Sequence, residues 1–222
     1  QAALRNRLEA AIGGTLALAP RPEPELLPTG IPEVDVRAGG LPRGALTEIC
    51  GPASSGRTTL LLSVMARAGE LGEACALIDT AGVFDPASAA AAGVHLDRLL
   101  WVRCGGNAET ALKAADLIVQ GGGFGLVVMD SGDAPPETAR RVSMTSWFRL
   151  RRAVEHTRTA LVAVEREPNA KSCASLVLEL PRGEARWSGA PGCSQLLRGL
   201  RVAMARRKPA GAAPCSFEAR SG

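Results

Sequence analysis

One short segment constrains the fold of this chain more than any other feature. The run Gly51-Pro-Ala-Ser-Ser-Gly-Arg57-Thr58 follows an apolar, β-rich stretch and precedes a helical pattern, which is the context of a phosphate-binding loop. Glycines let backbone N–H groups turn toward phosphate oxygens, and the helix N-terminus adds partial positive charge. The sequence therefore predicts a nucleotide site whose candidate contacts are Gly51, Ser54, Ser55, Gly56, Arg57, Thr58 and Thr59.

Arg57 stands where this loop motif has lysine. Lysine is a compact point charge, whereas arginine is a longer planar fork that must displace something to occupy the same space. An alternative interpretation stays open, in which lysine was replaced by arginine at this position and the function was retained. The chain contains only three lysines, Lys113, Lys171 and Lys208, so such a replacement would fit its general preference for arginine.

Two carboxylates follow predicted strands at the edge where ligands of open α/β sheets bind. Asp130 ends an apolar run and, with the Thr58 hydroxyl, is a candidate Mg²⁺ contact. Asp79 ends the predicted strand Cys75–Asp79 and is either a water-orienting carboxylate or a structural cap. The sequence leaves both interpretations open.

Short β-rich runs alternate with helical patterns from Gly44 onward, which predicts an α/β fold with a mainly parallel sheet and crossover helices on both faces. The predicted strands are Leu46–Cys50, Cys75–Asp79, Leu99–Val102, Leu126–Asp130 and Ala160–Glu165. The predicted helices are Thr58–Ala68, Pro86–Ala92, Ala108–Gln120, capped by Asn107, and Ser146–His156. Three later runs, Leu176–Leu180, Ala185–Ser188 and Leu200–Ala205, predict an antiparallel extension.

The length of 222 residues suits one such domain with short arms. Apolar periodicity predicts a helix over 2–13, followed by a proline-rich linker, so that residues 1–28 form an arm. The core domain is expected over 29–208 and a flexible tail over 209–222. Gln1 suggests that the chain is a fragment.

Composition excludes several classes of protein. The net charge of +4 is too small to indicate a nucleic-acid binder by itself. The six cysteines are spaced singly, which argues against structural zinc and favours reduced thiols. No apolar run approaches the roughly 18 residues that span a bilayer, and no signal-peptide pattern is present. We therefore expect a cytoplasmic protein without membrane contact.

Residues 28–180 resemble bacterial RecA in the order and spacing of several segments. These are Leu27-Pro-Thr-Gly-Ile-Pro-Glu-Val-Asp35, Gly39-Gly-Leu-Pro-Arg-Gly44, Glu48-Ile-Cys-Gly-Pro-Ala-Ser-Ser-Gly-Arg-Thr-Thr59 and Ile78-Asp79 with Phe84-Asp85-Pro86. The resemblance implies a RecA-like nucleotide site that includes Asp85.

Departures from RecA fall at the positions that carry its activity. Ala81 aligns with the catalytic glutamate, Ser88 with the aromatic residue that stacks on adenine, and Glu165 with the glutamine that senses the γ-phosphate. The long DNA-binding loop is reduced to Arg166–Lys171. The resemblance therefore implies a site with no catalytic residue, in which ATP and Mg²⁺ bind weakly and are not required.

The remaining pattern is similar to RecA-related mutagenesis proteins of the ImuA type, through the altered loop, the absent C-terminal domain and the segment 103–112. This resemblance implies an accessory or adaptor role in translesion DNA synthesis during the SOS response to DNA damage. The implied partners are an inactive Y-family polymerase homologue, an error-prone replicative-type polymerase and RecA itself. A nucleoid location and self-association through the N-terminal helix are further expectations.

A basic segment offers a candidate contact surface for DNA or a protein partner. Its arginines are interleaved with Trp147 and Phe148, an arrangement that can bind single-stranded DNA through phosphate contacts and base stacking. A solvated helix face whose aromatic residues belong to the core, or a protein-contact surface, is the favoured alternative. The candidate residues are Arg140, Arg141, Arg149, Arg151 and Arg152.

Two functions of different classes therefore stand. The first is a non-catalytic adaptor with a RecA-like fold. The second is a slow ATPase, DNA-dependent or of the circadian-clock type, that tolerates Arg57 and uses Asp79 or Glu165 as its base.

Overall fold

The computed structural model describes residues 24–189 and 194–220. The predicted N-terminal helix and most of the predicted linker lie outside these residues. The described helices are α2 Pro32–Ala38, α3 Arg57–Glu70, α4 Pro86–Ala91, the short 3₁₀ helix η1 Leu96–Arg98, α5 Ala108–Gly121, α6 Pro136–Arg140 and α7 Met144–Val154. The strands are β1 Leu26–Leu27, β2 Leu41–Pro42, β3 Ala45–Cys50, β4 Cys75–Asp79, β5 Leu99–Arg103, β6 Leu126–Asp130, β7 Ala160–Glu165, β8 Leu176–Glu179, β9 Glu184–Ser188, β10 Leu196–Lys208 and β11 Cys215–Arg220.

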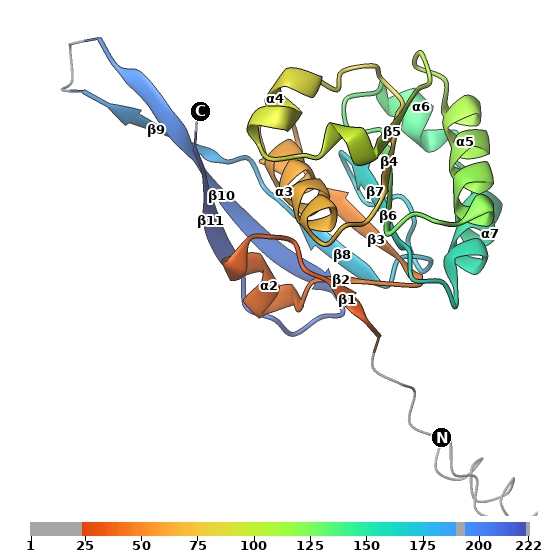
Figure 1. The fold of residues 1–222 in the computed structure, drawn as a ribbon. Coiled ribbons are helices and arrows are strands. Elements are labelled where there is room, and N and C mark those ends of the chain that lie inside the picture. The colour runs from red at the N-terminus through yellow and green to blue at the C-terminus, as the bar shows by residue number, and fades with distance from the viewer. Residues whose placement is uncertain (1–23, 190–193, 221–222) are drawn as a thin grey trace, which may run out of the picture.

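A nine-stranded sheet forms the centre of the molecule and confirms the predicted α/β class (Figure 1). Its strand order is β5-β4-β6-β7-β3-β8-β10-β11, and β9 pairs with β10. The strands from β5 to β8 run parallel, whereas β9, β10 and β11 pair antiparallel. Parallel strands covered on both faces carry continuous apolar runs, which is why β4, β6 and β7 were visible in the sequence.

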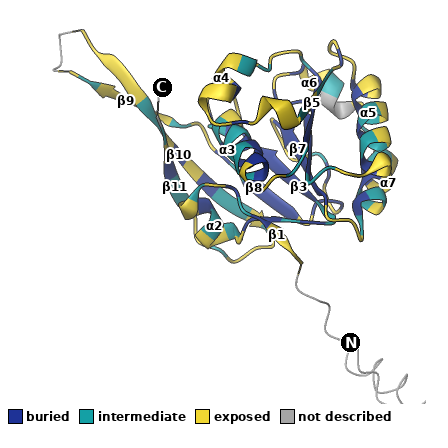
Figure 2. Ribbon diagram, viewed as in Figure 1, coloured by how far each residue is buried: buried dark blue, intermediate teal, exposed yellow. Residues whose placement is uncertain are grey.

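Two apolar clusters, one on each face, hold the helices to the sheet. The central strands of the sheet are mostly buried (Figure 2). One cluster joins Leu60 and Met65 of α3 to strand residues such as Leu77. The other joins Trp147 and Leu150 of α7 to the opposite face of the same strands. Successive side chains of a strand point to opposite faces, so each central strand contributes to both clusters.

The helices and strands predicted for the core are confirmed to within about two residues, except that β10 is much longer than the predicted run Leu200–Ala205. The helix predicted over Ser146–His156 begins at Met144, because the Ser143 side chain accepts a hydrogen bond from the Ser146 N–H at its N-terminus. The short helices α2 and α6 were not predicted. The cap on α5 is as predicted, with the Asn107 side chain accepting from the N–H groups of Glu109 and Thr110.

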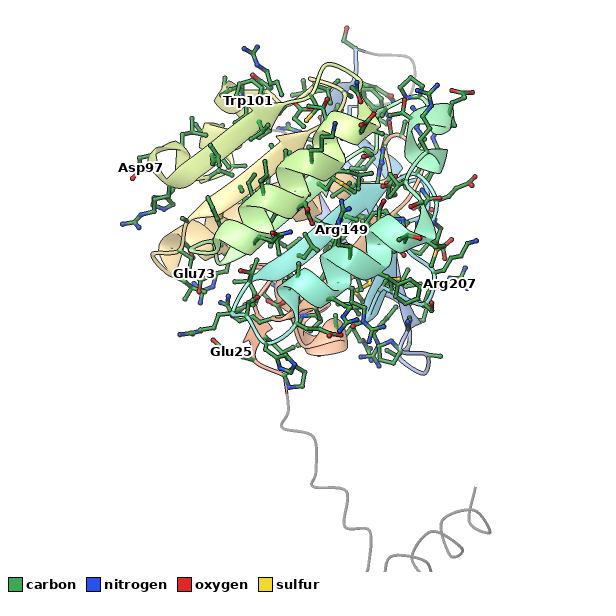
Figure 3. All side chains as sticks on the ribbon, turned by 90° about the vertical axis from the view of Figure 1, so that its right-hand side faces the viewer. Glu25, Glu73, Asp97, Trp101, Arg149 and Arg207 are labelled. Atoms are coloured by element: carbon green, nitrogen blue, oxygen red, sulfur yellow. The ribbon has the colours of Figure 1, made fainter. Side chains whose placement is uncertain are left out.

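The described end of the linker is attached to the core. β1 pairs with β2, and Leu27 is fully buried. The Glu25 carboxylate lies 2.6 Å from Arg158 and 3.3 Å from Arg43, and Arg43 also pairs with Glu73. The carboxylates of Glu25 and Glu73 lie at the same end of the sheet (Figure 3). The core therefore begins earlier than the predicted residue 29.

The C-terminus corrects the sequence analysis. Residues 209–222 were expected to form a flexible tail, whereas β11 pairs along β10 from Cys215 to Arg220 and buries Phe217 in the core. β9 and the first part of β10 form a two-stranded ribbon that projects from the body (Figure 1). Among the described cysteines Cys50, Cys75, Cys104, Cys173 and Cys215 are free thiols. None of the described helices has the length and apolar character needed to cross a bilayer.

Candidate nucleotide-binding site

The predicted loop lies between β3 and α3, as the motif requires. Its first residue donates from its N–H to the Glu165 carbonyl at 3.2 Å. Gly56 adopts a left-handed conformation with φ of 87°, and α3 begins at the next residue. Thr58 is exposed at the first turn of α3 and Thr59 is half-buried. The structure therefore places the predicted loop residues together at the N-terminus of one helix.

The C-terminal segment of the chain holds this loop from outside. A Cβ on Gly51 would overlap the Leu180 carbonyl oxygen, and a Cβ on Gly56 would lie 2.5 Å from the Val202 side chain. The Gly183 N–H donates to the Ser54 carbonyl at 2.9 Å. Both glycines are thus required by contacts within the protein. Sequence reasoning missed these contacts because they come from residues far along the chain.

Arg57 is the largest departure from the motif, and its side chain is buried, with 6% exposure. Nη1 donates to the Glu165 carbonyl at 3.1 Å, and Nη2 lies 3.4 Å from the Asp133 carboxylate. The guanidinium also lies against Gly132, where a Cβ would overlap it. One carbonyl therefore binds both the start of the loop and Arg57, whose charge is paired at the ends of β6 and β7.

Ser55 is the loop residue with an unused polar group. Its side chain is buried, and its hydroxyl has no hydrogen-bond partner among the described residues. Ser54 is exposed and adopts a left-handed φ of 59°. The Ser55 hydroxyl and the open first turn of α3 are thus compatible with a phosphate. The Arg57 guanidinium, however, is already bound by the Glu165 carbonyl and the Asp133 carboxylate.

Asp79 acts as the structural cap of the loop that follows β4. Its Oδ1 accepts from the N–H groups of Gly82 and Val83, and its Oδ2 accepts from Phe84 N–H at 3.0 Å and from Trp101 Nε1 at 3.3 Å. With four donors around it, this carboxylate holds residues 80–84 in place. The cap interpretation is therefore the one that the geometry supports.

Trp101 completes this arrangement on the edge strand β5 (Figure 3). Its ring packs edge-to-face on Phe84 with 5.3 Å between centroids, and the Arg103 guanidinium lies 5.1 Å from its centroid. Ala81 sits half-buried in the loop that these residues fix. The methyl side chain of Ala81 cannot orient water.

Asp85 and Asp130 accept hydrogen bonds from nearby backbone groups. Asp85 caps α4, accepting from the N–H groups of Ala87 and Ser88 and from the Ser88 hydroxyl. Asp130 accepts from Gly132 N–H at 2.9 Å. Burial raises the pKa of Asp130 to about 6, which weakens it as a metal contact below neutral pH because a protonated carboxyl is a poor ligand.

Glu165 and Glu48 form a buried acidic pair beside the loop that sequence reasoning did not foresee. Glu48 Oε1 accepts from the N–H groups of Asn169 and Ala170, while Glu48 Oε2 and Glu165 Oε1 have no partner among the described residues. Burial, and then the negative charge of Glu48, raise the pKa of Glu165 to about 8. Glu165 is therefore mostly protonated at neutral pH.

The predicted basic surface on α7 is only partly available. Trp147 belongs to the core with 1% exposure, whereas Phe148 is 46% exposed, so only one of the two aromatic side chains is a core residue. Arg149 pairs with Asp116 of α5 (Figure 3), and Arg151 pairs with Glu155. The remaining candidates are exposed Arg141 and Arg152, while the side chain of Arg140 lies outside the described part of the chain.

Residues 17–141, more than half of the chain, match the family of RecA N-terminal domains. The chain belongs to this RecA family. It is 34% identical over 156 residues to protein RecA of Chloroflexus aurantiacus, a match that covers 63% of this chain and 44% of the relative. It is 35% identical over 156 residues to protein RecA of Deinococcus radiodurans, covering 63% and 43%. It is 45% identical over 109 residues to that of Methylococcus capsulatus, covering 48% and 31%.

The chain thus spans less than half the length of the RecA proteins it matches. Membership of the RecA family agrees with the mainly parallel central sheet and with the loop at the start of α3.

Proposed function

We propose that this RecA-family chain is a catalytically degenerate, ImuA-type protein that acts as an adaptor in damage-induced mutagenesis. The observation that carries the proposal is the position of Arg57, held by the Glu165 carbonyl and Asp133. A phosphate-binding loop needs a free cation for the β- and γ-phosphates. Here the family's cation is replaced by a side chain that is already paired within the protein.

The loss of a catalytic carboxylate supports the same proposal. Phosphoryl transfer needs a group that orients the attacking water. Ala81 lacks one, Asp79 is engaged by four donors, and Glu165 is mostly protonated at neutral pH because its pKa is raised to about 8. We therefore expect no nucleotide hydrolysis above background.

The residues present fit a bound nucleotide only in part. The backbone of residues 51–56, the unpartnered Ser55 hydroxyl and exposed Thr58 would contact phosphate, and Thr58 with Asp130 would hold Mg²⁺. Since Arg57 adds no charge to this set, ATP and Mg²⁺ would bind weakly and would not be required. No step of the proposed function passes through a nucleotide.

As an adaptor the chain would work through contacts with other components of translesion synthesis. The proposed partners are the inactive Y-family polymerase homologue, the error-prone replicative-type polymerase and RecA, with single-stranded DNA as a further candidate at Arg141 and Arg152. These partners place the proposed site of action in the cytoplasm at the nucleoid.

Steady-state phosphate release from ATP, with and without single-stranded DNA, tests the proposal. We expect rates equal to buffer background for the wild-type chain and for Thr58→Ala. Thr145→Ala, which changes an exposed threonine on α7, serves as the matched control. Turnover that Thr58→Ala abolishes and Thr145→Ala leaves intact would establish a slow ATPase and rule out the adaptor-only function.

A further inference from the structure

The C-terminal part of the chain, from the ribbon to β11, carries a concentration of positive charge that the rest of the chain lacks. Residues 181–222 contain eight basic and two acidic side chains, a net charge of +6, whereas the whole chain has +4. Residues 1–180 therefore carry −2. The basic residues of this segment are Arg182, Arg186, Arg198, Arg201, Arg206, Arg207, Lys208 and Arg220. A surface of this sign favours an acidic partner.

Large apolar side chains are exposed on the same ribbon. Trp187 is 57% exposed and Leu196 is 59% exposed. Cross-strand partners share one face of a sheet, so the register places Trp187 with Leu197, and Ala185 with Leu200, on the face that continues into buried Val202. The apolar face of β10 thus runs out of the core and ends in an exposed tryptophan.

The opposite face of the ribbon carries most of the polar side chains, together with Leu196, which the register pairs with Ser188. Glu184, Arg186 and Ser188 alternate with the apolar residues of β9, and the register places Arg201 opposite Glu184. Arg198 donates from Nε to the Ser188 hydroxyl at 2.9 Å. An extended segment lying along β9 would therefore lie beside Ala185 and Trp187 on one face. On the other face it would lie beside Glu184, Arg186 and Ser188, over which Arg198 reaches.

Several cations of this C-terminal part of the chain are already paired, which argues against a nucleic-acid site. Arg186 pairs with Glu218, Arg207 pairs with Glu179, and Lys208 donates to the carbonyls of Ser172 and Ala174. Arginines 182, 198 and 201 form no ion pair with a described residue. A single-stranded nucleic acid needs many free cations and no aliphatic surface. Tryptophan beside arginine is instead the composition of protein-binding hot spots.

β9 also offers a backbone edge. Within the described residues it pairs with β10 alone, so the N–H and C=O groups on its outer side are open to a further strand. Natural edge strands are usually blunted by charge, proline or brevity. An exposed tryptophan on such an edge has the opposite effect, because it adds apolar surface for an incoming strand.

We propose that β9 is a docking edge for an extended acidic segment of a partner protein, which adds to the sheet as a strand. Its apolar side chains would pack beside Trp187, and its acidic side chains would lie beside Arg198, whose Nε reaches the Ser188 hydroxyl of β9. Main-chain hydrogen bonds provide affinity in this mode and alternate side chains provide specificity. The proposal rests on the proposed adaptor function and specifies a contact surface for it.

Binding of synthetic peptides to the full chain tests this docking edge. The probe is a labelled ten-residue peptide in which glutamate alternates with valine or phenylalanine, measured by fluorescence anisotropy. We expect it to bind at least about tenfold more tightly than a peptide of the same composition with acidic and apolar residues in separate blocks. Two further peptides carry N-methyl groups on alternate residues, one on the odd and one on the even positions. Only one of the two should lose binding, since an added strand donates hydrogen bonds to its neighbour from every second N–H.

Two variants locate the site. Trp187→Ala should weaken binding at least about tenfold, and Arg198→Glu, which leaves the tryptophan in place, should also weaken it. Leu100→Ala, an exposed leucine on the opposite edge strand β5 with 43% exposure, is the matched control and should leave binding unchanged. Tryptophan emission should shift to the blue when the peptide binds, because exposed Trp187 becomes covered. Trp147 is buried and Trp101 is half-buried, so neither is expected to change as much.

The proposal would be overturned if the alternating peptide did not bind, or if alternating and blocked peptides bound equally. Equal binding by wild type and Trp187→Ala would also overturn it. So would tight binding of a thymidine 20-mer that depends on Trp187 while the peptide fails. A monomer–dimer shift caused by Trp187→Ala would assign the edge to a second copy of the chain and would also overturn it. Phosphate release is read separately, so failure of the docking edge leaves the proposal of a degenerate nucleotide site standing.

Discussion

The loops over 51–56 and 80–85 both follow parallel strands at one edge of the sheet, yet different forces hold them. The first is held by packing, with Gly56 against Val202 and Gly51 against the Leu180 carbonyl. The second is held by one carboxylate, Asp79, which accepts three backbone N–H groups and an indole N–H. In both loops the protein itself supplies the contacts that fix the conformation, so neither needs a ligand to be ordered.

The largest expected effect comes from breaking the packing of the first loop. Gly56→Ala should lower the free energy of unfolding by about 3–4 kcal/mol, because it combines left-handed backbone strain with overlap against Val202. Urea denaturation measures this loss. Gly105→Ala is the matched control, since Gly105 has φ of 58° and a Cβ added there would meet nothing within 4 Å, and it should lose only about 1–2 kcal/mol. Equal losses would show that the packing contact contributes nothing.

The second loop should respond to loss of its carboxylate. Asp79→Asn places an NH₂ group against two of the four donors, so we expect a loss of about 2–3 kcal/mol in the free energy of unfolding. Faster hydrogen exchange at residues 82–84 should accompany it. Asp116→Asn, which removes the carboxylate of a partly exposed pair with Arg149, should lose about 0.5 kcal/mol or less. Similar losses in the two variants would contradict the role given to Asp79.

A smaller effect depends on pH and tests the acidic pair beside the first loop. Burial raises the pKa of Glu165 from 4.5 to about 8 in the folded chain, so the native state holds this proton more tightly than the unfolded state. Stability from this group therefore falls as pH rises from about 4.5 to 8. Glu165→Gln removes that fall, and the variant should exceed wild type by about 1–2 kcal/mol at pH 9. Parallel stability curves of the two proteins from pH 5 to pH 9 would contradict the raised pKa.

No effect at all is expected from Arg57→Lys on hydrolysis. The lysine restores the motif cation, but Ala81 still leaves the attacking water without a carboxylate. Phosphate release should therefore remain at background in this variant. Strong turnover in the single variant would show that Arg57 alone had removed the activity.

The sequence predicted those parts of the molecule that depend on local pattern. Strands buried on both faces are continuous apolar runs, and the α5 cap at Asn107 is a local signal. β11 was missed because its stability comes from pairing with β10 and from burial of Phe217, neither of which is visible in a segment rich in small residues.

The candidate site shows the same division. The loop and the Asp130 position followed from motif and strand pattern, but the partners of Arg57 did not. Glu165 and Asp133 come from other strand ends, and Gly132 gives the guanidinium its space only in the folded chain. Charge, likewise, was informative only by region, since the total of +4 conceals the basic segment 181–222.

The most direct test is a crystal structure of the chain with Mg²⁺ and a non-hydrolysable ATP analogue. We expect the Arg57 guanidinium to remain on the Glu165 carbonyl and Asp133, with any bound phosphate contacted by the loop backbone and Thr58. An Arg57 side chain that reaches the terminal phosphate, with an in-line water held by an acidic side chain, would contradict the central claim that this loop no longer supports hydrolysis.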